Sequence, residues 1–311
     1  MSLYDVLAPA KLNLFLHVVG RRPDGYHLLQ SVFRFVGLYD TLNFDLRADG
    51  HIVRDGTHYG LPPDEDLVVR AARALQRATG VQQGVQIHYV KSIPVGAGLG
   101  GGSSDAASTL VALNRLWDTR LSRQDLMRLA LPLGADVPVF VFGQPAFAEG
   151  VGEILSPVTV PECAYLIVQP CQEVATAAVF SAPDLTRNSV CIKMSVFADW
   201  QQARAGLPLG SSQGRLLGFG HNDLEPVVFG KYPVVRSASE WLLEHGVPSR
   251  MTGSGACLFT EFASLEQAAG CQREILGKIR CESGSGGKAV IKNAWACPGL
   301  VDHPLRHWQH S

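Results

Sequence analysis

The feature that most constrains this chain is a glycine-rich run at residues 94–104, PVGAGLGGGSS. Residues 85–90 before it alternate like a β-strand, and residues 103–117 after it have the apolar spacing of an amphipathic helix. Glycines let backbone N–H groups approach an anion closely, and the N-terminus of the following helix carries partial positive charge. We therefore predict a strand, loop and helix that bind the phosphates of ATP or of another polyphosphate.

The glycine run differs from two well-known phosphate-binding loops and from a linker. A Walker A loop ends in Lys-Ser or Lys-Thr, and the glycine loop of protein kinases is followed by a Val-Ala-Ile-Lys strand. Neither feature is present here. A flexible linker is seldom flanked by a patterned strand and a patterned helix. The candidate nucleotide-binding residues are Pro94, Val95, Gly96, Ala97, Gly98, Leu99, Gly100, Gly101, Gly102, Ser103 and Ser104.

The composition is that of a globular protein, with 46% hydrophobic residues among 311 and a formal net charge of −1. A chain of this length is longer than a single hydrophobic core usually supports, so we expect two domains, 1–156 and 157–311. The near-zero charge argues against a nucleic-acid partner, and no signal peptide or membrane-spanning stretch is recognisable. We expect a cytoplasmic monomer or weak homodimer that acts on a small molecule. Its seven cysteines contain no Cys-x-x-Cys pair and suggest reduced structural thiols.

Hydrophobic periodicity predicts a mostly β beginning, followed by a mixture of helices and strands. Strands are expected at 6–19, 29–36, 41–46, 51–54, 85–90, 137–141, 165–168 and 257–262, and helices at 66–79, 103–117, 123–133, 234–244 and 265–276. The Gly- and Ser-rich stretches 206–220 and 283–287 are expected to be exposed loops.

Phosphoryl transfer to an alcohol needs positive charge near the transferred group and benefits from a carboxylate that takes the hydroxyl proton. Lys11, in an apolar strand, and Asp136, where a helix gives way to the next segment, are our candidates. The pattern leaves alternatives open, since a strand lysine is usually solvated and an aspartate after Gly-Ala usually forms a turn or cap. Tyr26 and His27, after a reverse turn, could stack on a ligand and hydrogen-bond it, or simply pack.

Several segments together resemble one enzyme family. They are 9–14 (PAKLNL), 22–27 (RPDGYH), the glycine run with its continuation to residue 107, 134–138 (GADVP) and 251–257 (MTGSGAC). From about residue 7 to residue 296 the chain is similar to the 4-diphosphocytidyl-2-C-methyl-D-erythritol kinases. That family belongs to the galactokinase, homoserine kinase, mevalonate kinase and phosphomevalonate kinase (GHMP) superfamily.

The resemblance implies an α+β fold, with a first domain like the second domain of a small-subunit ribosomal protein and a ferredoxin-like C-terminal domain. It implies transfer of the ATP γ-phosphoryl group, with Mg²⁺, to the 2-hydroxyl of the methylerythritol part of the substrate, a step of the non-mevalonate route to isoprenoids. By position, Asp136 would be the general base and Lys11 its partner. Tyr26 and Phe180 would enclose the cytosine ring, and the substrate-binding residues would be Asn13, Tyr26, His27, Phe33, Thr176 and Phe180.

Some segments depart from the family pattern or stay open. Asp66 stands where the family usually has Asn. A carboxylate cannot donate the hydrogen bond that the Asn amide would donate. The segment 222–226 (NDLEP) is interpreted most simply as a helix cap. Residues 186–220 and the tail after 298 match no motif, and we expect the tail histidines at the surface. The rival functions are another GHMP kinase, acting on homoserine or mevalonate, and a nucleotide-binding relative without turnover.

Overall fold

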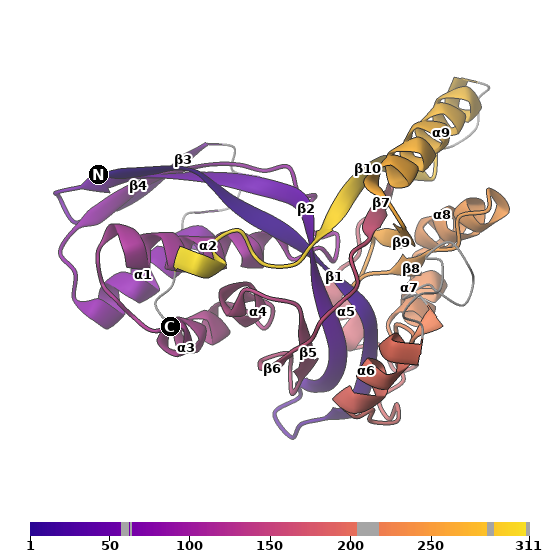
Figure 1. The fold of residues 1–311 in the computed structure, drawn as a ribbon, viewed down its shortest axis with the longest axis horizontal. Coiled ribbons are helices and arrows are strands. Elements are labelled where there is room, and N and C mark those ends of the chain that lie inside the picture. The colour runs from indigo at the N-terminus through magenta and orange to yellow at the C-terminus, as the bar shows by residue number, and fades with distance from the viewer. Residues whose placement is uncertain (57–61, 63, 204–217, 285–288, 309–311) are drawn as a thin grey trace.

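Two long strands form the spine of the protein. The computed structural model describes residues 1–56, 62, 64–203, 218–284 and 289–308. The antiparallel strands β1 (Ser2–Arg21) and β2 (His27–Arg47) run from one half of the molecule into the other (Figure 1). Because both halves share these strands, residues of β1 can contact segments that lie far away in the sequence.

The strand β2 is continuous, so the prediction of separate strands at 29–36 and 41–46 was wrong. Its register with β1 shifts after Pro9, and this bulge takes up the two extra residues of β2. A Cβ on Gly37 would lie 2.8 Å from the ring of Pro298, so glycine lets the last strand of the chain come alongside. The glycine that suggested a break is therefore a point of close approach between two strands.

The described strands form one connected sheet. Its order is β3 (Ile52–Gly56), β4 (Gly84–Val90), β2, β10 (Ile291–Leu300), β7 (Ala164–Pro170), β9 (Leu258–Phe262) and β8 (Arg250–Met251). In addition, β1 pairs with β2, and β5 (Ala146–Glu149) pairs with β2 and with β6 (Ile154–Pro157). The pairing of β2 with Gly299 and Leu300 of β10 joins the two halves of the sheet.

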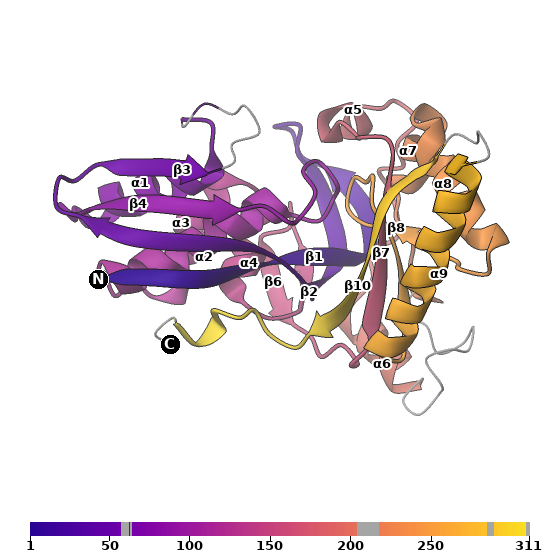
Figure 2. The ribbon, with the colours of Figure 1, turned by 90° about the horizontal axis from the view of Figure 1, so that it is seen from above.

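Helices cover one face of the sheet in the first half (Figures 1 and 2). They are α1 (Leu67–Thr79), α2 (Gly101–Leu116), α3 (Arg123–Ala130), the short 3-10 helix η1 (Leu131–Leu133) and α4 (Val137–Phe142). Asp66 caps α1 by accepting from the Val68 N–H, and Ser122 forms a capping box for α3. The helix α2 begins two residues earlier than predicted, inside the glycine run.

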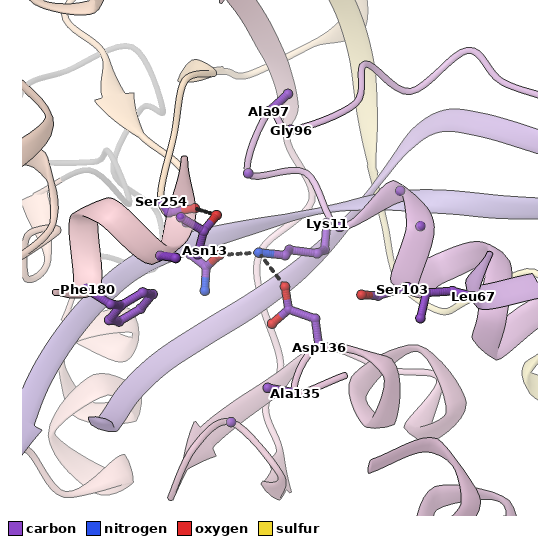
Figure 3. Close-up of a pocket in the computed structure, with 18 of the residues that line it drawn as sticks. Lys11, Asn13, Leu67, Gly96, Ala97, Ser103, Ala135, Asp136, Phe180 and Ser254 are labelled. Carbon is purple, nitrogen blue, oxygen red and sulfur yellow. Dashed lines mark hydrogen bonds and ion pairs between the residues drawn. The ribbon is translucent and has the colours of Figure 1, made fainter. Parts of the chain in front are cut away.

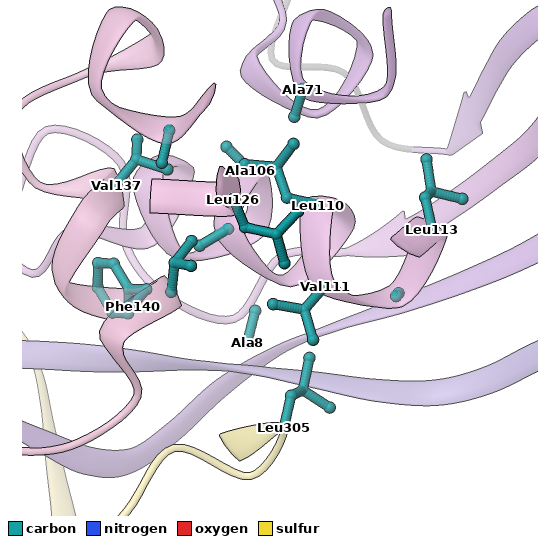
Figure 4. Close-up of a cluster of buried hydrophobic side chains, with 14 of the residues drawn as sticks. Ala8, Ala71, Ala106, Leu110, Val111, Leu113, Leu126, Val137, Phe140 and Leu305 are labelled. Carbon is teal, nitrogen blue, oxygen red and sulfur yellow. The ribbon is translucent and has the colours of Figure 1, made fainter. Parts of the chain in front are cut away.

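Residues 137–141 belong to α4, so the prediction of an extended segment there was wrong. Pro138 lies in the first turn, where no helical N–H is required, and Gly143 ends the helix with a φ of 80°. Val137 and Phe140 pack in the core against α2 (Figure 4). A short apolar run that is buried on all sides shows no period, and it cannot be assigned to helix or strand from sequence alone.

The core of the first half includes the end of the chain. Leu110 and Val111 of α2 and Leu305 belong to the same buried cluster (Figure 4). The tail follows β10 onto this half, and His303 is only 3% exposed, with its ring against Phe35 and Phe140. The prediction that the tail histidines lie at the surface was therefore wrong for His303.

The second half contains the elements predicted there. The helices α8 (Pro233–Glu244) and α9 (Leu265–Gly284) and the strands β7 and β9 are present, although α9 is longer than expected. The remaining helices are α5 (Thr176–Phe180), α6 (Met194–Ala203), α7 (Glu225–Lys231) and the 3-10 helix η3 (Arg306–Trp308). The predicted loops at 206–220 and 283–287 fall largely outside the described residues.

The described side chains bear on two further expectations. The cysteines among them are free thiols. Over the same part of the chain, every helix is too short or too polar to cross a lipid bilayer.

Candidate active site

A single cleft of about 890 Å³ brings the predicted site segments together (Figure 3). Its walls come from β1, the start of β2, the glycine run, residues 135–136, α5 and the turn at 253–254. These segments span both halves of the sequence. The volume lies at the upper end of the roughly 300–1,000 Å³ typical of small-molecule sites.

The glycine run is held as an ordered loop at one end of the cleft. Gly96, Gly98 and Gly100 have φ values of 64°, 75° and 72°, which favour glycine. A Cβ on Gly98 would lie 2.2 Å from the carbonyl oxygen of Thr252, so the loop packs directly on the 252–255 turn. The Lys11 N–H also donates to the Leu99 carbonyl at 2.9 Å.

A buried ion cluster that the sequence did not predict supports the start of α2. The Lys91 ammonium contacts the carboxylates of Asp40 and Asp105, and Asp40 also accepts from the Ser92 and Ile93 N–H groups. Burial raises the pKa of Asp105 to about 8, despite the attraction of Lys91. Burial alone would lower the pKa of Lys91, but the two carboxylates raise it. The cluster ties β2, the strand end at 90 and α2 together below the loop.

The catalytic candidates Lys11 and Asp136 meet in the middle of the cleft (Figure 3). The Lys11 side chain is 3% exposed, and its Nζ lies 3.2 Å from Asp136 Oδ2. The same Nζ donates to Asn13 Oδ1 at 2.6 Å and lies over the Phe33 ring, 5.5 Å from its centroid. Asp136 precedes α4 and remains 37% exposed toward the cleft. The lysine is thus buried and paired, while the carboxylate stays accessible.

Aromatic side chains line the far end of the cleft. Tyr26 is 62% exposed, and the rings of His27 and Phe180 have centroids 5.2 Å apart. On the same side, the Thr176 hydroxyl lies 2.7 Å from the Ser254 hydroxyl. This end therefore offers flat apolar surfaces together with hydroxyl and imidazole groups.

Nearly all of the predicted site residues line this cleft, and two do not. Leu99 is 1% exposed and packs in a hydrophobic core cluster. The Ser104 side chain is fully buried, and its N–H donates to the Gly100 carbonyl at 2.8 Å as part of α2. Ser103, by contrast, faces the cleft beside the Gly134 turn. The structure therefore places Ser103, but not Ser104, where a ligand can reach its hydroxyl.

The departure at Asp66 has a structural reason. Besides capping α1, its carboxylate contacts the Arg54 guanidinium and accepts from the Tyr89 hydroxyl at 2.6 Å. Burial and the bond to this carboxylate both raise the pKa of Tyr89 above its usual range. The carboxylate of Asp66 thus has its hydrogen-bond and charge partners within the protein, although the residue also lines the cleft.

The segment 222–226 gives α7 no side-chain cap, so that interpretation was wrong, although Asn222 Oδ1 accepts from the Leu224 N–H at 3.0 Å just before the helix. The Asn222 side chain donates to the carbonyls of Met251 and Gly253 at 2.8 Å. Asp223 accepts from the Val18 N–H at 2.6 Å, whereas α7 begins without a side-chain cap. The segment connects β1 to the 251–257 turn and so helps to shape the cleft wall.

The chain is similar to known proteins over almost its whole length. Residues 66–144 match the family GHMP kinases N terminal domain, and residues 208–278 match GHMP kinases C terminal. The 4-diphosphocytidyl-2-C-methyl-D-erythritol kinase of Bordetella parapertussis is 58% identical over 310 residues, which cover 99% of both chains. The enzyme of the same name from Thiobacillus denitrificans is 55% identical over 298 residues, 96% of both chains.

Solved structures show the same fold. A crystal structure of 4-(cytidine 5'-diphospho)-2C-methyl-D-erythritol kinase superposes with a TM-score of 0.76 at 33% identity, covering 96% of this chain and 99% of that one. A homoserine kinase from Cytophaga hutchinsonii has a TM-score of 0.68 at 19% identity, covering 97% of this chain and 95% of its own, and shows the fold alone. The predicted α+β GHMP kinase fold is confirmed, and the chain belongs to the GHMP kinases and, among them, to the family of 4-diphosphocytidyl-2-C-methyl-D-erythritol kinases.

Proposed function

We propose that this protein transfers the γ-phosphoryl group of ATP to the 2-hydroxyl of 4-diphosphocytidyl-2-C-methyl-D-erythritol. The observation that carries the proposal is the pair Lys11 and Asp136, 3.2 Å apart, between the glycine loop and the aromatic end of one cleft. A hydroxyl bound there can meet a phosphoryl donor on one side and a proton acceptor on the other. The family relatives named for this reaction, at up to 58% identity over the whole chain, support the same substrate.

The glycine loop is the proposed site of the ATP phosphates. Its left-handed glycines expose backbone N–H groups at the N-terminus of the 16-residue helix α2, and Ser103 adds a hydroxyl. The described residues contain no cluster of three or more His, Cys, Asp or Glu side chains suited to a metal. This fits Mg²⁺ that would be bound chiefly by the phosphates and water, as is usual for this ion. When bound, the ion would neutralise phosphate charge.

The proposed chemistry uses Asp136 as general base. Its carboxylate accepts the proton of the attacking hydroxyl as the new O–P bond forms and the bond between the β- and γ-phosphates breaks, which releases ADP. Lys11 is held by Asn13 and Asp136, so its ammonium is positioned without further reorganisation. It polarises the hydroxyl and stabilises negative charge on the transferred group.

The proposed substrate site is the aromatic end of the cleft. A pyrimidine ring would lie between Tyr26 and Phe180, with His27 hydrogen-bonded to the base. Asn13, Phe33 and Thr176 line the path from this end toward Lys11. The cleft therefore has room for the base at one end and the reacting hydroxyl at its centre.

Several expectations stay predictions. They are the domain limits at 1–156 and 157–311, a cytoplasmic location, a monomeric or weakly dimeric state, and the absence of nucleic-acid or membrane partners. The expected limits assign residue 305 to the second domain, whereas Leu305 packs in the core of the first half.

The test is phosphoryl transfer from γ-labelled ATP with Mg²⁺. We expect labelled product from 4-diphosphocytidyl-2-C-methyl-D-erythritol, inhibition by cytidine nucleotides, and no product from homoserine or mevalonate. Transfer to either of the other alcohols in preference would contradict the proposed substrate. ATP binding without transfer to any of the three would favour a non-catalytic relative.

A further inference from the structure

Arg187 lies in the stretch 186–220, which matched no family motif, and it joins both walls of the aromatic end. Its guanidinium donates to the carbonyls of Leu185 at 3.1 Å, Phe180 at 3.3 Å and Ala182 at 2.6 Å. Its Nε–H points to Nε2 of His27 at 3.1 Å. One side chain thus fixes the end of α5, which carries Phe180, relative to the imidazole at the start of β2.

The bond to Arg187 decides which nitrogen of His27 carries the proton. A guanidinium has only donors and stays charged in proteins, so the imidazole nitrogen that faces it must accept. A neutral imidazole that accepts at Nε2 carries its proton on Nδ1. His27 is therefore an N–H donor through Nδ1, and among the described residues no hydrogen-bond partner occupies that atom.

The surroundings of His27 favour the neutral ring. Burial lowers its pKa, and the positive charges of Arg187 and of Arg21, at the end of β1, lower it further. These two arginines are the charged groups that act on the ring, while the face toward α5 is covered by Phe180. These effects all favour the neutral ring, in which the bond to Arg187 selects one tautomer.

We propose that Arg187 is a positioning residue for the nucleobase, which fixes His27 as the Nδ1–H tautomer so that it donates to an acceptor atom of a pyrimidine. In cytosine that acceptor is N3 or O2. Arg187 is not among the residues that line the cleft, whereas His27 and Phe180 are, so it acts through them and not by contact with the base. This inference rests on the proposed function, because it assumes that a pyrimidine occupies this end.

The kinetic test is Arg187→Met, with Arg236→Met as the matched control. Arg236 also donates to a main-chain carbonyl but lies on α8, outside the cleft. Without Arg187, the neutral ring is free to take the Nε2–H form, whose Nδ1 opposes an acceptor on the base. At pH 8 we expect the KM for the cytidine substrate to rise about 10-fold, as for loss of one hydrogen bond to the base, with kcat and the KM for ATP nearly unchanged.

The pH dependence separates this role from a purely structural one. In Arg187→Met one of the two positive charges that lower the pKa of His27 is gone, so this pKa rises; lowering the pH then protonates more of the ring, and a protonated ring donates through Nδ1. The raised KM of the variant should therefore fall again from pH 8 to pH 6, relative to the wild type and to Arg236→Met. A KM raised equally at all pH values would mean that Arg187 only supports α5, and an unchanged KM would overturn the inference outright.

A second measurement needs neither a variant nor turnover. Long-range ¹H–¹⁵N correlation spectra of the imidazoles, in wild-type protein labelled on histidine, should show His27 as a neutral Nδ1–H tautomer at pH 7. An Nε2–H tautomer would refute the inference even if the enzyme is active. Failure of the wild type to phosphorylate the cytidine substrate would instead refute the proposed function and leave the tautomer result standing.

Discussion

Replacing Asp136 by asparagine tests the centre of the proposed mechanism. The amide keeps the size of the side chain but cannot take up a hydroxyl proton. Because phosphoryl transfer has a loose transition state, positioning and electrostatics supply most of the rate, and a general base adds about 10²–10⁴-fold. We expect kcat to fall by that factor, which corresponds to roughly 3–5 kcal/mol in the barrier.

The structure predicts that this variant folds and binds ATP. Lys11 keeps its hydrogen bond of 2.6 Å to Asn13, so its buried ammonium is not left without a partner. Asp136 is 37% exposed, and loss of its ion pair should cost only about 1 kcal/mol of unfolding free energy, or roughly 2–4 °C in Tm. The glycine loop packs on the 252–255 turn and not on Asp136, so the Kd for ATP should stay within about 3-fold of the wild type, a difference of less than 1 kcal/mol.

The assay is steady-state turnover, together with calorimetric binding of ATP and thermal unfolding. Asp199→Asn, an exposed aspartate on α6 outside the cleft, is the control for the same chemical change. A kcat within tenfold of the wild type would refute Asp136 as the base. A matching loss of ATP affinity would show that the residue supports the loop and does not act on the proton.

Three further outcomes follow from the geometry. Gly98→Ala should cost about 2–5 kcal/mol in urea unfolding, because of its positive φ and the clash with the Thr252 carbonyl, whereas Gly96→Ala, in open space, should cost about 1 kcal/mol. Burial lowers the pKa of His303 to about 3, so between pH 6.5 and that value only the unfolded state gains a proton. The free energy of unfolding should therefore fall by about 2 kcal/mol between pH 7 and pH 5. His303→Gln should remove that part of the loss. Lys91→Met leaves two buried aspartates without their cation and should destabilise the protein by about 3–5 kcal/mol in urea unfolding; a cost under 1 kcal/mol would contradict the buried cluster.

Local signals in the sequence were sufficient for most helices and for the phosphate loop. Asp66 and Ser122 cap the helices that they precede, and Gly80 ends α1 with a φ of 70°. These features depend on residues within a few positions of one another. The wrong predictions at 37–40 and 137–141 have a different cause. The conformation at Gly37 depends on the close approach of Pro298, and that of α4 depends on packing against α2. Both partners are distant in the sequence, so no local pattern indicates them.

In the candidate site, too, the sequence predicted some residues and missed others. The motifs located Lys11, Asp136 and the aromatic residues, but not the groups that hold them. Lys91 was missed because a lysine after a strand is usually solvated, and only the fold brings the carboxylates of Asp40 and Asp105 to it. Supporting residues of this kind come from distant segments and carry no spacing signal.

The position of Lys11 shows why a strand lysine is buried here. Its own N–H binds the Leu99 carbonyl, its ammonium binds Asp136, and the N–H of Asn13, two residues later, binds the Thr252 hydroxyl at 2.9 Å. Two residues in the middle of β1 therefore set the relative positions of the phosphate loop, the proposed base and the 251–257 turn. Since alternate residues of a strand share one face, a slip of one residue in the pairing of β1 with β2 would turn Lys11 and Asn13 away from the cleft together. The bulge after Pro9 lies next to these residues, so the register of the spine is itself a requirement for assembling the site.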